Sequence, residues 1–167
     1  MKRNAITAEE GNFRIKVKIN GEDRELKVGV TETLVDALRR YGWKGTKKGC
    51  NTGDCGTCTV IMDGKAVLGC MMPAVMAHGR SLTTIEGLGS VRHPHPIQQA
   101  FVEAGAVQCG FCIPGMIMSS KALLDRNPDP TEAEIRKALD GNICRCTGYV
   151  TQVAAVRLAA EKLAGAK

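Results

Sequence analysis

The chain has 167 residues, and its 23 lysines and arginines outnumber its 17 aspartates and glutamates to give a formal charge of +6. The basic residues are scattered, and three phenylalanines, two tyrosines and one tryptophan are too few for a base-stacking platform, so we expect no nucleic-acid partner. No apolar run approaches the roughly 18 to 20 residues of a membrane span, so we expect no direct membrane insertion. The first residues lack the apolar stretch of a signal peptide, which predicts a cytoplasmic protein.

The N-terminal half begins with a polar segment and continues with strand patterns. Residues 1–11 lack periodicity and are expected to be a flexible tail. Residues 13–19 alternate between apolar and basic side chains, which predicts a half-buried strand. The turn signal at 20–23 then predicts a second strand over 24–28. Thr31 is the expected N-cap of the helix that follows.

A glycine-rich loop over 45–56 separates this helix from a second strand pair. Strands are expected over 57–62 and 65–68, on either side of the hairpin signal Asp63-Gly64. A last strand is expected at 81–85. Strands crossed by one helix predict a small α+β domain over 12–88.

The C-terminal half is predicted to be helical. A capping box at Thr131 marks the start of one helix, and a Pro-rich segment precedes it. Short connections between the helices indicate a four-helix bundle. The linker falls within 87–96, so the helical domain is expected at 89–167, with helices over 96–103, 113–125, 131–139 and about 149–163.

Four of the eight cysteines lie in the first half. Their spacing, C-x4-C-x2-C-x11-C, is that of a plant-type [2Fe–2S] site. A structural zinc site is the alternative, but cysteine-only zinc sites usually use paired C-x2–4-C knuckles. We therefore expect iron–sulfur ligands at Cys50, Cys55, Cys58 and Cys70.

The other four cysteines are Cys109, Cys112, Cys144 and Cys146. Their spacing is C-x2-C, 31 residues and C-x-C, and a zinc ribbon stays open on spacing alone. Both pairs precede expected helices, whose N-termini offer N–H groups and positive dipole ends. That placement favours an anionic cluster, so two redox centres are expected in all.

Three segments together resemble one known family. Gln108–Met116 and Gly141–Tyr149 resemble the two signatures of the second cluster domain in the xanthine oxidase family, and Gly49–Cys58 resembles that family's first cluster loop. Ile113 departs from the pattern, since many members carry threonine there, but it is not a ligand position. The resemblance extends over about residues 13 to 163.

The resemblance implies a β-grasp, plant-type ferredoxin-like domain followed by a four-helix domain, hence an α+β fold. It implies the electron-transfer subunit of a molybdenum hydroxylase, which passes electrons from a Mo-pterin centre through two [2Fe–2S] clusters toward FAD or another acceptor. The cluster of Cys109, Cys112, Cys144 and Cys146 would lie nearer molybdenum, and Gln108 would hydrogen-bond the pterin. The expected partners are a large molybdenum-binding subunit and, usually, a medium FAD-binding subunit.

The chain shows no residue set for substrate chemistry of its own, since neither a dinucleotide fingerprint nor a P-loop is present. Two other readings remain: a freestanding two-cluster ferredoxin and a zinc-stapled interaction module. Substrate, terminal acceptor and cluster potentials are not encoded in patterns that the sequence reveals.

Overall fold

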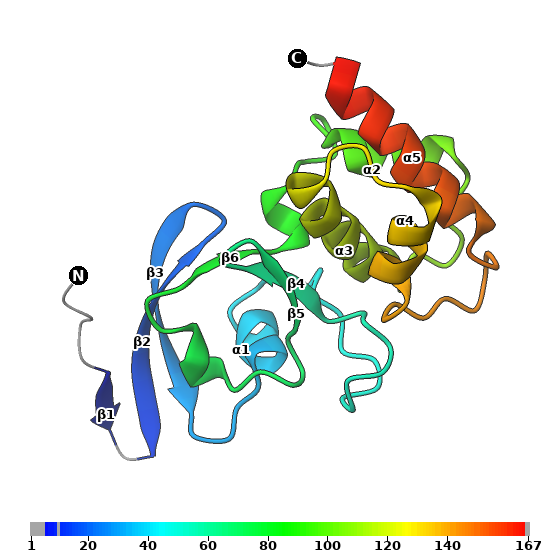
Figure 1. The fold of residues 1–167 in the computed structure, drawn as a ribbon. Helices are drawn as coiled ribbons and strands as arrows, with labels where there is room; N and C mark the ends of the chain where they lie inside the picture. Colours follow the sequence, from blue (N-terminus) through cyan, green and yellow to red (C-terminus); the bar gives the residue numbers. More distant parts are fainter. Residues whose placement is uncertain (1–5, 10, 166–167) are drawn as a thin grey trace.

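A sheet-containing half and a helical half make up the protein in the computed structural model, which describes residues 6–9 and 11–165 (Figure 1). The first half follows from two adjacent strands, β2 (Asn12–Ile19) and β3 (Glu22–Gly29), which pair antiparallel. Asn20 and Gly21 between them have φ of +53° and +87°, as a two-residue hairpin turn requires. This tight turn starts the second strand two residues earlier than the sequence predicted.

Four short strands complete a mixed sheet. The strand order is β1-β2-β6-β4-β5, with β3 on β2 outside this path, and β6 is parallel to β2. The predicted Asp63-Gly64 hairpin joins β4 and β5, and both of its residues have positive φ. These strands are β1 (Thr7–Glu9), β4 (Thr59–Met62), β5 (Lys65–Leu68) and β6 (Ser81–Thr83).

Two expectations for this half need correction. The predicted tail contains a strand at Thr7–Glu9, because its backbone pairs with the start of β2; residues 1–5 and 10 lie outside the described part of the chain. Helix α1 (Leu34–Arg40) is capped by Thr33 rather than Thr31. The Thr33 hydroxyl accepts from the Asp36 amide, whereas Thr31 lies in the turn before it.

Helix α1 packs its apolar side against the sheet. Its buried residues Leu34, Ala37 and Leu38 share one core with the inward side chains of β2 and β3. The period of two seen in β2 thus places Ile15, Val17 and Ile19 inside.

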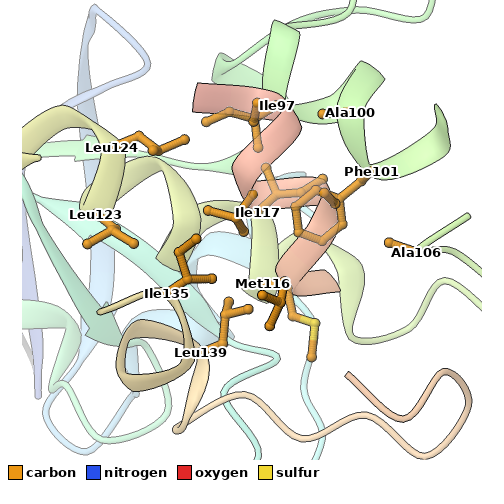
Figure 2. Packing of buried hydrophobic residues seen from close by; sticks show 14 of the residues in the cluster. Ile97, Ala100, Phe101, Ala106, Met116, Ile117, Leu123, Leu124, Ile135 and Leu139 are labelled. Atoms are coloured by element: carbon orange, nitrogen blue, oxygen red, sulfur yellow. The ribbon is translucent and has the colours of Figure 1, made fainter. Parts of the chain in front are cut away.

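Four helices form the second half, and Figure 2 shows how their apolar residues meet in one core. Phe101 and Ile97 pack near Met116 and Ile117, while Ile135 and Leu139 close the other side. No helix in the described residues is both long and apolar enough to span a membrane. The helices are α2 (Pro96–Glu103), α3 (Ile113–Arg126), α4 (Glu132–Leu139) and α5 (Val150–Gly165).

Helix α3 also joins the two halves. Its residues Met118 and Ala122 bury themselves against Ile61 of β4. The domain boundary between residues 88 and 89 stays a prediction, because the apolar contact of α3 with β4 links the two halves.

Candidate metal centres

The first cysteine quartet lies along one edge of the sheet domain. Cys50 and Cys55 lie on the loop between α1 and β4, Cys58 directly precedes β4, and Cys70 follows β5. The Cys50 and Cys55 amides each donate to the other residue's sulfur at 3.4 Å, and the Cys70 amide donates to Cys58 Sγ at 3.5 Å. The hairpin brings the last ligand candidate back to the loop, so the structure groups all four cysteines as two pairs.

Backbone geometry lets this loop close around its sulfurs. A Cβ atom on Gly49 would come within 2.8 Å of both Cys55 Sγ and Thr57 Oγ1, so only glycine fits there. Gly53 and Gly56 have φ of +89° and +69°, which glycine adopts without strain. N–H groups directed at sulfur stabilise added negative charge, so the donor set suits an anionic cluster that gains an electron.

Before iron binds, the thiols of this loop differ in acidity. Hydrogen bonds from Thr52 lower the pKa of Cys50 to about 5, so this thiol is ionised at neutral pH. Burial raises the pKa of Cys58 to about 11. Because iron binds thiolates, cluster assembly has to displace the Cys58 proton, and the metal's charge supplies the driving force.

The second quartet lies at the ends of helices. Cys109 follows α2, Cys112 is the N-cap of α3, and Cys144 and Cys146 lie between α4 and α5. The sulfurs of Cys109 and Cys146 are 3.5 Å apart. Both residues are exposed, whereas Cys112 is buried.

Hydrogen-bond donors also approach this second site. The Cys146 amide donates to Cys144 Sγ at 3.4 Å, and the Thr147 hydroxyl lies 3.4 Å from the same sulfur. Burial alone would raise the pKa of Cys144, but the donors of Thr147 and Cys146 outweigh it and lower the pKa to about 7. Burial, with a further contribution from Cys144, raises the pKa of Cys112 to about 12.

Helix α5 begins one residue after its predicted start at about 149. Gly148 and Tyr149 have φ of +67° and +71°, and the helix begins at Val150. The reason is local: the Tyr149 hydroxyl turns back to accept from the Cys144 amide at 2.8 Å. Sequence reasoning also missed Thr57, Thr147 and the fully buried Gln152, which donates to Thr147.

One cavity connects the two quartets. It has a volume of about 280 Å³ and is lined by Cys50 and Cys55 from the first site and by all four cysteines of the second. Phe111 and Ile143 form part of its wall and are about half exposed. Gln108 is exposed on the same loop as Cys109. A larger hollow of about 650 Å³ lies over charged residues of β2 and β3, but no cysteine lines it. The candidate site is therefore identified by its cysteine lining and not by the volume of the cavity.

In a [2Fe–2S] cluster each iron is bound by two cysteines. No three Cys, His, Asp or Glu side chains among residues 6–9 and 11–165 converge on a single ion position. The sulfurs come instead in twos, Cys50 with Cys55 and Cys58 with Cys70, and Cys109 with Cys146 and Cys112 with Cys144. The residues present therefore fit two-iron clusters.

Comparisons with known proteins define the class. Residues 17–80 match the model of a 2Fe-2S iron-sulfur cluster binding domain, and residues 84–157 match that of a [2Fe-2S] binding domain. The chain is thus a two-domain [2Fe–2S] protein.

Its relatives are more specific. It is 49% identical to the nicotinate dehydrogenase small FeS subunit of Eubacterium barkeri, over 90% of this chain and 96% of that one. It is similar to quinoline 2-oxidoreductase from Pseudomonas putida 86, with a TM-score of 0.89, 40% identity, and 93% and 98% coverage. Aldehyde oxidoreductase from Desulfovibrio gigas gives a TM-score of 0.89 and 43% identity over 92% of this chain and 17% of that longer one.

The chain belongs to the family of small [2Fe–2S] subunits of molybdenum hydroxylases. It is an iron–sulfur electron-transfer subunit of a multi-subunit oxidoreductase, and a large catalytic subunit is its partner.

Proposed function

We propose that this chain conducts electrons from the Mo-pterin centre of a large subunit to the FAD of a medium subunit, through two clusters in a fixed order. The cluster held by Cys109, Cys112, Cys144 and Cys146 receives the electrons first. The cluster held by Cys50, Cys55, Cys58 and Cys70 passes them on. The observation that carries this proposal is the shared cavity, onto which cysteines of both quartets open.

The proposed direction of electron transfer rests on which residues of each site are exposed. Cys109, Cys146 and Gln108 are exposed together at the second site, where a docked subunit could reach them. The Gln108 amide can donate and accept hydrogen bonds, which suits a pterin ring edge. Beside the first site, Met71 packs close to Gly53 of the first cysteine loop and is 60% exposed, which offers an apolar contact for the flavin subunit.

Each cluster supplies one-electron storage when bound, so the two electrons of a substrate oxidation pass one at a time. The chain's own residues do the rest. Cysteines hold the iron, and amides of the first loop donate to the sulfurs and favour the reduced charge. Cys58 and Cys70 keep one side of that centre buried. We propose the cytoplasm as the compartment, because cysteine ligands have to stay reduced before assembly.

The substrate belongs to the large subunit in this proposal. The named relatives differ in their substrates. This chain is similar to the small subunits of nicotinate dehydrogenase and nicotine 6-hydroxylase, and to the iron-sulfur-binding subunit of an aldehyde oxidoreductase. One electron-transfer fold serving several substrates supports a substrate pocket outside it.

The test is metal analysis of the tagged chain purified without oxygen from its own host. About four irons per chain, with stoichiometric molybdenum and flavin, is the expected result. Iron without molybdenum would favour a freestanding ferredoxin, and zinc in place of iron would overturn the redox function.

Two variants test the order. Cys109→Ser should abolish substrate reduction of both clusters, and full turnover with a flavin-side acceptor would contradict the assignment of Cys109. In an assembled Cys55→Ser complex, substrate should still reduce the remaining cluster. If the EPR signal of the remaining cluster failed to appear on substrate addition, the proposed order of the two clusters would be wrong.

A further inference from the structure

A single buried side chain, that of Asn142, ties the two cysteine loops together. Asn142 lies two residues before Cys144 and is 3% exposed. Its amide nitrogen donates to the Gly56 carbonyl at 3.0 Å, and its amide oxygen accepts from the Ser119 hydroxyl at 2.7 Å. Gly56 lies between Cys55 and Cys58, and Ser119 lies on α3. Asn142 therefore bonds to the first cysteine loop and to α3 at once.

The backbones around Asn142 are in close contact. A Cβ atom on Gly56 would lie 2.2 Å from the Gly141 carbonyl oxygen, and one on Gly115 would lie 2.3 Å from the Gly56 carbonyl oxygen. The neighbouring Ile143 amide donates to the Cys55 carbonyl at 3.0 Å. Three segments from both halves of the chain thus meet without space for a side chain between them.

Asparagine suits this position because its side chain both donates and accepts. Aspartate has nearly the same shape but, when ionised, no donor, so a carboxylate oxygen would face the Gly56 carbonyl. That contact is repulsive and leaves a buried acceptor unpaired, so the ionised carboxylate favours a junction that moves apart.

We propose that Asn142 is a positioning residue that fixes the separation and orientation of the two clusters. The inference rests on the proposed function, since it needs a cluster in each quartet. Electron transfer weakens steeply with distance, so a junction that opens slows the step between the clusters while leaving each cluster bound to its cysteines.

Asn142→Asp in the complete complex is the test, and the readout is the magnetic interaction between the two reduced clusters. Two nearby unpaired spins split each other's EPR lines, and the splitting falls with the cube of their distance. We expect full iron content, a smaller or broadened splitting, and electron transfer between the clusters slowed several-fold. Asn127→Asp, at the end of α3, is the matched control and should change neither quantity.

Wild-type splitting in an Asn142→Asp complex that retains its iron would overturn the inference. If this variant fails to hold iron, Ser119→Ala decides, because it removes one of the amide's two partners and leaves the Gly56 bond. It should reduce the splitting by a smaller amount, and an unchanged splitting would overturn the inference. Absence of iron from the wild-type chain would instead contradict the proposed function.

Discussion

The two cysteine sites differ in how far their own chain encloses them. At the first, Cys58 and Cys70 are buried, and four backbone amides donate to sulfur from within the loop and hairpin. At the second, Cys109 and Cys146 are exposed, and the Cys146 amide and the Thr147 hydroxyl lie beside Cys144 Sγ. The first site is completed by local folding, whereas the second leaves one side open to the surface.

This difference separates two ways of building a redox centre. At the first site Cys58 and Cys70 form a small buried cluster with Val35 of α1. At the second site Cys112 belongs to the core of the helical domain and Cys144 packs against it, whereas Cys109 and Cys146 are exposed. Loss of a buried ligand should therefore unfold more structure than loss of an exposed one, and the second site is the one with an exposed pair.

The largest expected effect comes from Cys58→Ser compared with Cys146→Ser. Each should lose one cluster, but Cys58→Ser should also lower the melting temperature of the sheet domain by about 10 °C or more. The reason is that metal binding contributes to folding and that Cys58 is buried in its domain whereas Cys146 is exposed. A change of 1 kcal/mol corresponds to about 4–8 °C in a domain of this size. Calorimetry with iron analysis measures both, and equal melting points for the two variants would remove the distinction.

Exposure should also make the second cluster the more labile. In the isolated chain, an iron chelator should remove its iron several-fold faster than that of the first cluster, because Cys109 and Cys146 are open to solvent. The two EPR signals report each loss separately. In the assembled complex, this difference should disappear, and a difference that persists would mean that no subunit covers the second site.

Gly115→Ala tests the close contact between α3 and the first cysteine loop. Its Cβ would meet the Gly56 carbonyl, a rigid backbone atom, so we expect a loss of roughly 1–3 kcal/mol in the free energy of unfolding. Gly141→Ala is the matched control, because nothing lies within 4 Å of a Cβ at Gly141. Denaturant unfolding of both variants compares them, and equal losses would show that the close approach does not matter.

Local patterns explain why most elements could be predicted. The four helices of the second half begin and end within two residues of their expected positions, since apolar spacing and the Thr131 capping box are local signals. The hairpin turns were recognisable for the same reason, because Asn-Gly and Asp-Gly favour positive φ.

The missed features depend on distant contacts. The hydrogen bond from Asn142 to Gly56 spans 86 residues, and no sequence pattern marks Asn142 as its donor. The strand at Thr7–Glu9 forms because its backbone pairs with β2, and its own residues show no alternation of apolar and polar side chains. The ligand spacing predicted the two quartets, but their opening onto one cavity followed only from the fold.

Threonine hydroxyls offer a smaller, site-specific effect. A thiolate sulfur has no proton to give, so Thr57 and Thr147 are the donors in their contacts with Cys55 and Cys144. Thr147→Val should lower the potential of the second cluster by roughly 20–60 mV, because one hydrogen bond contributes about 0.5–1.5 kcal/mol and 1.4 kcal/mol equals 59 mV for one electron. Thr57→Val should lower only the first potential, and the serine variants should restore both. Redox titration followed by EPR tests this, and identical potentials would show that neither hydroxyl donates.

The smallest effect concerns the ion pair that anchors the first cysteine loop. Lys48, two residues before Cys50, bonds to Asp36 of α1 at 2.7 Å. This bond and that from Thr33 outweigh burial and hold the pKa of Asp36 below its ordinary value. A depressed carboxyl pKa adds stability above the pKa of the unfolded chain, about 3.9, and that stability is lost as the pH falls through the folded value.

Asp36→Asn should therefore cost less than about 1 kcal/mol at pH 7, since the pair is more than one-third exposed, and nothing near pH 2. Urea unfolding of the wild type and the variant across this range measures the difference. Asp23→Asn, whose carboxylate is 89% exposed, is the control. A cost that stayed constant with pH would mean that Asp36 acts through packing, and the first loop would then be held by its hydrogen bonds to sulfur rather than by charge.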